Sequence, residues 1–360
     1  MARAPLSRGM LDAAAIAKTD PGGLGKALAS LPEQLENGLR RGLGTHVGVE
    51  DASRIFIVGL GGSAIAGDVF ASWVADRSKV PIQVVRDYRL PSYAQPGDLL
   101  VAVSYSGTTE ETLAATAQGI KLGCRLVAVT SGGTLARLAG DSGGDLIEVP
   151  GDLPAPRASF GHLFGILPAI GETWVYGDLP GELRRAVVRL KQLREEIRPD
   201  VPLRKNRAKL IATRLKDRTP ILYGAPPMVP VAKRWQTQLN ENAKVVAFAS
   251  AFPEADHNEL VGWCEDPSAK RFAPILLRDR DESPEMRRRL DATAAMMNRR
   301  TKVESVEDDS EEILGRMLGL LYLGDFVSLY VAALRRVDPL PVLPIAELKA
   351  RLAPRTRAKN

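Results

Sequence analysis

Cysteine, histidine and aromatic side chains are scarce in this chain. Its 360 residues include two cysteines, three histidines and 5% aromatic residues. Two cysteines cannot build a disulfide framework, and they are not in C-x-x-C spacing. Because the three histidines are also far apart in sequence, we expect no metal site. No apolar run approaches the 18 or more residues of a membrane helix and no charged-then-apolar leader opens the chain, so we expect a cytoplasmic protein that does not bind membranes.

Charge of one sign is not concentrated either. Lysine and arginine number 49 against 43 acidic residues, a net charge of +6, but the two signs alternate through most of the chain. No predicted helix has a concentrated basic face, which indicates a solvated mixed surface rather than nucleic-acid binding. A mild positive field would help attract anionic substrates. The basic segment Arg355 to Lys359 is expected to be a frayed tail.

Apolar runs alternate with helical periodicity along the chain. Leucines at three-to-four spacing predict a helix over residues 24–39. In the first half we predict strands over 55–58, 82–85, 99–103, 126–130 and 146–149, and helices over 64–75, 110–122 and near Leu135. In the second half we predict strands over 221–223, 245–248, 274–277 and 302–306, and helices over 163–175, 183–197, 231–240, 284–297 and 310–334. This alternation predicts an α/β protein with doubly wound parallel sheets.

Glycine and proline crowd between residues 151 and 156, which indicates a domain junction. The chain is long enough for two domains, each with a sizeable core. We therefore expect an N-terminal domain over residues 1–153, a C-terminal domain over 154–352 and a basic tail over 353–360. Two such halves predict a functional site in the cleft between them.

Two loops rich in glycine and hydroxyl groups follow neighbouring strands. The segment SYSGTT at 104–109 precedes a predicted helix, where backbone N–H groups and hydroxyls suit a phosphate. The segment GLGGSA at 59–64 follows the strand before it. Alone, one could be a helix cap and the other a dinucleotide fingerprint. Strand 82–85 is followed by Arg86 rather than the acidic residue of that fingerprint, so the pair favours a ligand with a sugar and a phosphate end.

The segments GLGGSAIAGD at 59–68 and SYSGTTEETL at 104–113 resemble the sugar isomerase (SIS) domain. Four further segments narrow the resemblance to the bifunctional phosphoglucose/phosphomannose isomerases: SGG at 131–133, PRASFG at 156–161, NENAK at 240–244 and HNE at 257–259. The resemblance extends from about residue 23 to residue 352. It implies two SIS-type domains, hexose 6-phosphate substrates, a homodimer and no cofactor.

The resemblance also implies which residues form the site. Substrate-binding residues are expected in the two loops: Gly61, Gly62, Ser63, Ser104, Ser106 and Thr109. The catalytic residues that it implies are Glu241, His257, Arg157 and Lys349.

Each catalytic assignment has a plainer alternative. Glu241 follows the predicted helix 231–240, whose unsatisfied carbonyls would make a carboxylate a better base, but spacing alone favours an ordinary surface glutamate. His257 could carry a proton near neutral pH, or be a solvated turn residue. Arg157 could form a domain-junction ion pair, and Lys349 could be a solvated helix lysine.

The resemblance implies an aldose–ketose isomerisation of glucose 6-phosphate to fructose 6-phosphate through a cis-enediol. His257, supplied by the neighbouring subunit, would open the ring, and Glu241 would move a proton between C2 and C1. Arg157 would face the negative charge of the enediolate. The relatives often read Asp-Pro-Thr-Pro where this chain has Leu340 in place of the threonine linked to mannose phosphate. We therefore expect weaker activity on mannose 6-phosphate.

Two alternatives stay open. One is a sugar-phosphate-sensing regulator without catalysis, although the residues before the first strand contain no convincing DNA-binding helix-turn-helix. The other is a different SIS enzyme. An amidotransferase would need a nucleophilic N-terminal cysteine, whereas this chain begins Met1-Ala2-Arg3, and a heptose-phosphate isomerase would be a single shorter domain.

Overall fold

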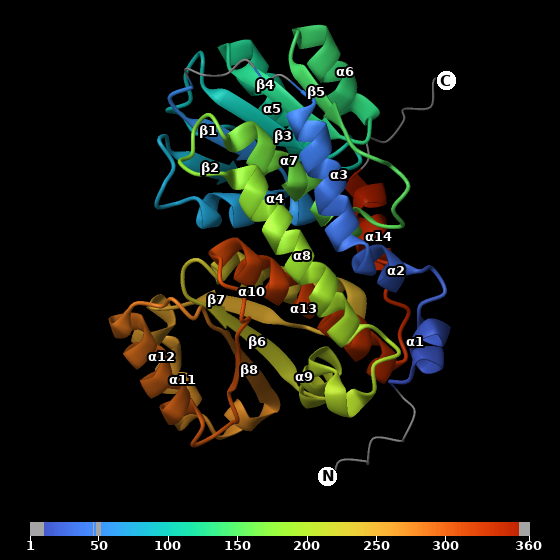
Figure 1. Cartoon of the computed structure of the whole chain (residues 1–360), viewed down its shortest axis with the longest axis vertical. Coiled ribbons are helices and arrows are strands. Elements are labelled where there is room, and N and C mark those ends of the chain that lie inside the picture. The colour runs from blue at the N-terminus through green and yellow to red at the C-terminus, as the bar shows by residue number, and fades with distance from the viewer. Residues whose placement is uncertain (1–10, 46, 48–51, 353–360) are drawn as a thin grey trace.

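The protein contains two parallel β-sheets surrounded by helices (Figure 1). This computed structural model describes residues 11–45, 47 and 52–352, so His46 and the basic segment Arg355 to Lys359 lie outside the described residues. The first sheet has five strands in the order β2-β1-β3-β4-β5, and the second has four in the order β7-β6-β8-β9. Every pairing within them is parallel, which confirms the predicted α/β fold class.

The first sheet is covered by helices on both faces. Its strands are β1 (Ile55–Val58), β2 (Ile82–Val85), β3 (Leu99–Val103), β4 (Arg125–Thr130) and β5 (Asp145–Glu148). Its helices are α5 (Glu110–Leu122) and α6 (Gly133–Ser142) on one face, and α3 (Leu31–Leu43), α4 (Gly61–Trp73) and α7 (Phe160–Gly171) on the other. Alternate side chains of β1 point to opposite faces, so Phe56 packs in the α5/α6 cluster and Ile57 in the other.

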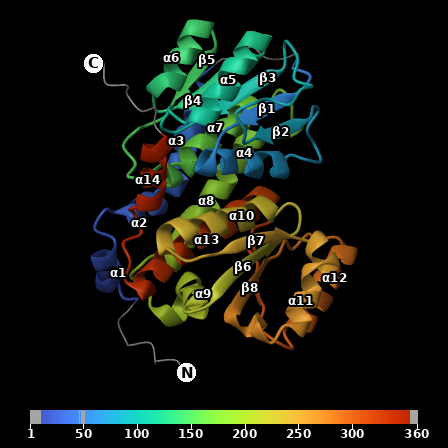
Figure 2. The same ribbon diagram turned by 180° about the vertical axis from the view of Figure 1, so that it is seen from behind.

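The second sheet repeats this arrangement. Its strands are β6 (Thr219–Gly224), β7 (Phe248–Ala251), β8 (Phe272–Leu277) and β9 (Glu304–Val306). Helices α11 (Glu259–Glu265) and α12 (Pro284–Met297) pack on one face; the other carries α8 (Leu179–Ile197), α9 (Arg207–Leu215), α10 (Val229–Ala243) and α13 (Ile313–Arg335). Seen from behind, α10 and α13 lie between the two sheets (Figure 2). One continuous apolar cluster therefore joins the inner faces of both sheets.

Several elements differ from the prediction. The helix expected over 24–39 is two helices, α2 (Leu24–Ala29) and α3, with Pro32 in the first turn of α3, where its missing N–H costs least. The strand expected over 245–248 is displaced to β7, because α10 continues to Ala243. Elements outside the prediction are short: α1 (Ala13–Thr19), α9, α11, α14 (Leu343–Leu352) and the 3-10 helices η1 (Pro156–Ala158), η2 (Leu203–Lys205), η3 (Glu254–His257) and η4 (Pro267–Arg271).

Helix α13 corrects one expectation. Its 23 residues are long and apolar enough, by length and composition alone, to cross a membrane, so the expected absence of such a segment was wrong. The helix is nevertheless buried among α8, α9 and α10. Its interior charges Arg316 and Asp325 both form ion pairs inside the protein. We therefore interpret α13 as a core helix.

Helix α7 follows the expected domain junction but packs on α3 and α4 of the first half. The α3–α7 crossing is very close, because a side chain at Gly38 would lie 2.4 Å from the carbonyl oxygen of His162. A side chain at Gly165 would lie equally close, 2.4 Å, to the carbonyl oxygen of Leu35. Helix α7 thus ties the two halves together, and the boundary at residues 153 and 154 stays a prediction.

Candidate active site

The two predicted loops lie side by side at the carboxyl edge of the first sheet. Strands β1 and β3 are parallel neighbours with Val58 opposite Ala102, so both strands end at the same edge. A side chain at Gly59 would lie only 2.8 Å from the carbonyl oxygen of Val103, and glycine permits this approach. The tertiary structure thus brings the glycine loop and the hydroxyl loop together.

The glycine loop forms the first turn of α4. This helix begins at Gly61, earlier than the predicted residue 64, and Gly61 has a φ of +54° that favours glycine. Gly62 and the buried Ser63 therefore stand in the first turn. The Ser63 N–H donates to the carbonyl oxygen of Leu60 at 3.1 Å, so the groups that this turn offers to a ligand are the N–H groups of its glycines and the Ser63 hydroxyl. This turn can bind an anionic oxygen.

The hydroxyl loop is fixed by hydrogen bonds and by one glycine. The buried Ser104 Oγ lies 3.1 Å from Thr109 Oγ1, and the exposed Ser106 Oγ accepts hydrogen bonds from Thr108 N at 3.3 Å and Thr108 Oγ1 at 3.1 Å. Gly107 has a φ of +64°, and a side chain there would lie 1.8 Å from the carbonyl oxygen of Gly132. Only glycine fits, so this loop holds its hydroxyls in a set shape.

Arg157 lies where the two halves meet. It belongs to η1 and is 5% exposed, and a side chain at Gly62 would lie 3.3 Å from its Cα. Its Nε donates to Asn242 Oδ1 at 2.6 Å, and its Nη2 donates to the carbonyl oxygens of Pro339 and Leu340, both at 2.8 Å. Arg157 therefore links the glycine loop, the end of α10 and the segment after α13.

The remaining edge of this guanidinium faces a carboxylate. Arg157 Nη1 lies 3.6 Å from Glu241 Oε2, and the Glu241 side chain is 28% exposed. Burial lowers the pKa of Arg157, and the negative charge of Glu241 opposes that shift. The pair thus has one protected cation and one carboxylate that solvent or a ligand can reach.

Lys244 closes α10 next to this pair. It has a φ of +54°, and its Nζ donates to the carbonyl oxygens of Glu241 and, at 3.1 Å, Pro339. Burial, with repulsion from Arg157 as the next cause, lowers the pKa of Lys244. Two cations therefore meet at the end of α10: Arg157 faces the Glu241 carboxylate, and Lys244 bonds the carbonyl oxygens of Glu241 and Pro339.

Known proteins show the same two-part organisation. Residues 49–155 match the SIS domain family, and residues 204–352 match the bacterial phospho-glucose isomerase C-terminal SIS domain. A protein of Caldicellulosiruptor bescii named bifunctional phosphoglucose/phosphomannose isomerase is 37% identical over 335 residues, 91% of this chain and 98% of that protein. This chain belongs to the bifunctional phosphoglucose/phosphomannose isomerase family. The family that the sequence motifs indicated is confirmed.

A second relative supports the same family, and a solved structure supports the fold. A protein of the same name from Thermoplasma acidophilum is 33% identical over 303 residues, 84% of this chain and 90% of that protein. The solved structure of a hypothetical protein from Thermus thermophilus superposes with a TM-score of 0.69 at 16% identity, covering 95% of this chain and 93% of that one. At that identity, the likeness shows the SIS-type fold alone.

Two predicted residues of this isomerase family member lie apart from the Arg157–Glu241 pair. His257 is exposed at the end of η3, and Lys349 is exposed on α14. Among the contacts of the described residues, neither side chain forms a hydrogen bond or ion pair with Arg157 or Glu241. Their predicted roles stay predictions.

The main chain and the side chain of Leu340 face different partners. Its carbonyl oxygen accepts from Arg157, whereas its side chain packs against Gly22 and the apolar cluster that includes Leu24 and Leu28. A side chain at Gly22 would lie 2.3 Å from Leu340 Cδ2. The leucine thus serves the packing of α2, with its backbone turned to the arginine.

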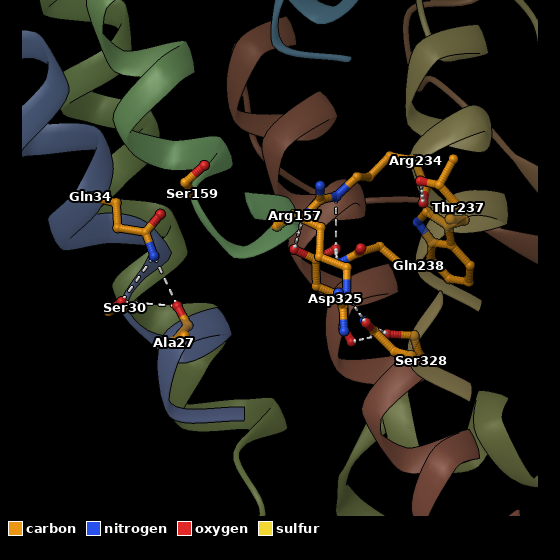
Figure 3. A network of polar contacts seen from close by, with 12 residues as sticks. Ala27, Ser30, Gln34, Arg157, Ser159, Arg234, Thr237, Gln238, Asp325 and Ser328 are labelled. Atoms are coloured by element: carbon orange, nitrogen blue, oxygen red, sulfur yellow. Dashed lines mark hydrogen bonds and ion pairs between the residues drawn. The ribbon is translucent and has the colours of Figure 1, made fainter. Parts of the chain in front are cut away.

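Sequence reasoning missed the residues that support Arg157. These are Asn242, which bonds its side chain, and Arg234 with Asp325, which Figure 3 shows beside it. A signal was present, because Asp325 is the one acidic residue in the apolar part of the predicted helix 310–334, beyond Glu311 and Glu312 at its start. A charge in such a helix requires a buried partner. Which residue provides it could not be read from the sequence.

The site lies apart from a large cavity. A cavity of about 820 Å³ opens between α4, β2, α10 and β7, and none of the predicted site residues lines it. Among residues 11–45, 47 and 52–352, no group of three or more histidine, cysteine or acidic side chains is arranged to hold a metal ion.

Proposed function

We propose that this protein interconverts glucose 6-phosphate and fructose 6-phosphate as an aldose–ketose isomerase. The observation that carries the proposal is the Arg157–Glu241 pair beside Gly62, at 3.6 Å between Nη1 and Oε2. A carboxylate and a buried cation beside the glycine loop support a proton transfer on a sugar bound there. The family membership supports the same reaction class.

The two loops would bind the phosphorylated sugar. Ser104, Ser106 and Thr109 would hold the phosphate through their hydroxyls, since each can donate to an anionic oxygen. The first turn of α4, with Gly61, Gly62 and Ser63, would bind nearby sugar or phosphate oxygens. The open Ser106 and the half-buried Thr109 leave this loop accessible.

Glu241 would act as the base that takes the proton from C2 of the open-chain aldose and returns it to C1. Arg157 Nη1 lies 3.6 Å from this carboxylate. Once Glu241 is protonated, Arg157 Nη1 would be free to face the negative charge on the cis-enediolate oxygens. Lys349 would add a further cation if α14 moves toward the site.

His257 would open the sugar ring from a second copy of the chain. Its exposure in η3 and its lack of contact with Arg157 and Glu241 in the described chain support a homodimer in which each site takes this histidine from the partner. We place the protein in the cytoplasm, in keeping with its free thiols Cys124 and Cys264, and expect neither a cofactor nor a nucleic-acid partner.

The test is an assay of the purified protein on glucose, fructose and mannose 6-phosphates, with and without EDTA. We expect turnover of glucose and fructose 6-phosphates that EDTA leaves unchanged. Mannose 6-phosphate should be turned over more slowly, because Leu340 lacks the hydroxyl linked to that substrate. Loss of all activity in EDTA with recovery on zinc would contradict the proposal, and sugar-phosphate binding without turnover would favour the sensor.

A further inference from the structure

A buried polar network connects α13 to Arg157. Its members on α10 and α13 are 2% exposed or less: Arg234, Gln238, Asn242, Asp325 and Ser328. Figure 3 shows Arg234, Gln238 and Asp325 grouped around Arg157 between these helices. The network sits in the core that joins the two sheets, where an unpaired charge or amide is costly.

One arm of the network fixes the backbone of Arg157. Asp325 accepts two hydrogen bonds from Arg234, from Nε at 3.0 Å and from Nη2 at 2.9 Å, and a third from Gln238 Nε2 at 2.8 Å. The same Nη2 of Arg234 donates to the carbonyl oxygen of Arg157 at 2.9 Å. The guanidinium of Arg234 also lies 5.3 Å from the ring centroid of Phe160, within the first turn of α7. Asp325 thus holds Arg234, which holds the Arg157 main chain.

The other arm fixes the side chain of Arg157. Ser328 Oγ donates its single proton to the carbonyl oxygen of Asp325 at 2.6 Å, so it can only accept from Asn242 Nδ2 at 2.9 Å. Asn242 must therefore turn its Oδ1 toward Arg157 Nε, at 2.6 Å. One serine proton sets the direction of the whole arm.

We infer that Asp325 and Arg234 are positioning residues that hold the Arg157 guanidinium against the Glu241 carboxylate. The inference rests on the proposed function for its catalytic consequence. A buried ion pair adds little stability compared with apolar residues of similar size, so stability alone does not explain this one. Both arms end on Arg157, one at its carbonyl oxygen and one at its Nε.

The decisive variant is Asp325→Asn, which removes the charge but keeps the shape. The matched control is Asp279→Asn, because Asp279 pairs with Arg316 in another buried ion pair on α13, with no contact to Arg157. We expect kcat of Asp325→Asn to fall about tenfold to a hundredfold with KM within several-fold, since a misplaced cation acts in the transition state. Asp279→Asn should lose less stability, because Arg316 keeps its ion pair with Asp281, and should keep kcat within about twofold.

A double variant separates positioning from general damage. If Asp325 acts through Arg157, Asp325→Asn should lower kcat little further when Arg157→Ala is already present. A full multiplicative loss in that background would overturn the inference. An equal fall of kcat in Asp279→Asn would also overturn it.

Crystal structures of both single variants give a readout that needs no activity. We expect Arg234 Nη2 to leave the carbonyl oxygen of Arg157, and the Arg157 guanidinium to shift from Glu241, in Asp325→Asn, and both contacts to stay in Asp279→Asn. If the wild type turns over no sugar phosphate, the proposed function is wrong, yet these structures still decide the positioning role. If Asp325→Asn does not fold, Arg234→Lys keeps the charge beside Asp325 but cannot bridge it to the Arg157 carbonyl oxygen; an unmoved Arg157 with unchanged kcat there would overturn the inference.

Discussion

At the scale of single residues, the contact between Arg157 and Glu241 decides what the candidate site can do. The arginine is nearly buried and commits its Nε and Nη2 to Asn242 and to the 339–340 carbonyls, which leaves Nη1 for the carboxylate. A cation held this firmly costs little reorganisation when charge develops nearby. Glu241 keeps the exposure that a proton carrier needs.

Replacing Glu241 by glutamine should abolish isomerisation and leave sugar-phosphate affinity within several-fold. The lost carboxylate acts mainly in the transition state, and a general base contributes about 10²–10⁴ in rate. Deuterium from solvent should enter C1 or C2 of the product with wild type and not with Glu241→Gln. The control Glu285→Gln removes a carboxylate from an exposed ion pair with Arg288 and should leave turnover unchanged. More than a tenth of wild-type turnover in Glu241→Gln would show that another group is the base.

His162 predicts a pH dependence of stability. Burial between α3 and α7 lowers its pKa from 6.5 to about 4, with Asp152 opposing the shift and Arg41 adding to it. Below pH 6.5 His162 binds a proton in the unfolded chain but stays neutral in the folded protein. The contribution of the neutral His162 to the unfolding free energy is therefore fully present above pH 6.5 and is lost as the pH falls toward 4.

Chemical denaturation of wild type and His162→Gln at pH 7.5 and 4.5 measures this contribution. From pH 7.5 to 4.5 the unfolding free energy of the wild type should fall by about 2–3 kcal/mol more than that of His162→Gln. A difference that stays constant between the two pH values would show that His162 titrates normally in the folded protein.

At the scale of elements, the crossing of α3 and α7 is the tightest contact between helices that precede and follow the expected junction. Gly38 and Gly165 allow the two backbones to touch, because the atoms that a side chain would meet are carbonyl oxygens that cannot move aside. Helix α7 leads directly from Arg157, so the crossing also fixes where the site arginine enters the fold.

Gly38→Ala should lower the unfolding free energy by about 2–3 kcal/mol, since its Cβ would lie 2.4 Å from the carbonyl oxygen of His162. The matched control is Gly140→Ala in α6, where the added Cβ meets nothing within 4 Å. That change should stabilise the helix by about 0.5–1 kcal/mol. Urea denaturation of both variants measures the contrast, and equal effects would mean that the close crossing is unimportant.

At the scale of the whole molecule, the contacts of the described residues include no hydrogen bond or ion pair between the proposed base Glu241 and the proposed ring-opening group His257. If the partner supplies His257 in a two-fold dimer, each site pairs Glu241 of one chain with His257 of the other. Glu241→Gln and His257→Ala would then be inactive alone but complementary when mixed. A heterodimer would carry both lesions in one site and neither in the other.

Refolding the two variants together should restore roughly a quarter of wild-type activity. Random pairing makes about half of the dimers mixed, and each mixed dimer has one intact site of two. The heterodimer fraction should be measured by native mass spectrometry, and each variant refolded alone serves as the control. No recovery with heterodimers present would place both residues of a site in the same chain.

The sequence by itself determined the strands and loops of the first half and the family. Strands β1, β2 and β3 have the predicted bounds. Strands β1 and β3 are short buried apolar runs, which leave few alternatives, whereas the edge strand β2 is only partly buried. The glycine and hydroxyl loops could be recognised because their chemistry is carried by consecutive residues. The same local reasoning placed Glu241 at a helix end, although α10 continues to Ala243.

Only the tertiary structure decided which distant groups meet. Arg157, Asn242 and Leu340 come from three separate segments, and their hydrogen bonds depend on how α7, α10 and α13 pack between the sheets. Local sequence patterns do not encode a partner 85 or 183 residues away, so the support of Arg157 by α13 could not be predicted. Packing also decided that the apolar α13 is a core helix, because its charges find partners only when α10 and the 279–281 segment lie against it.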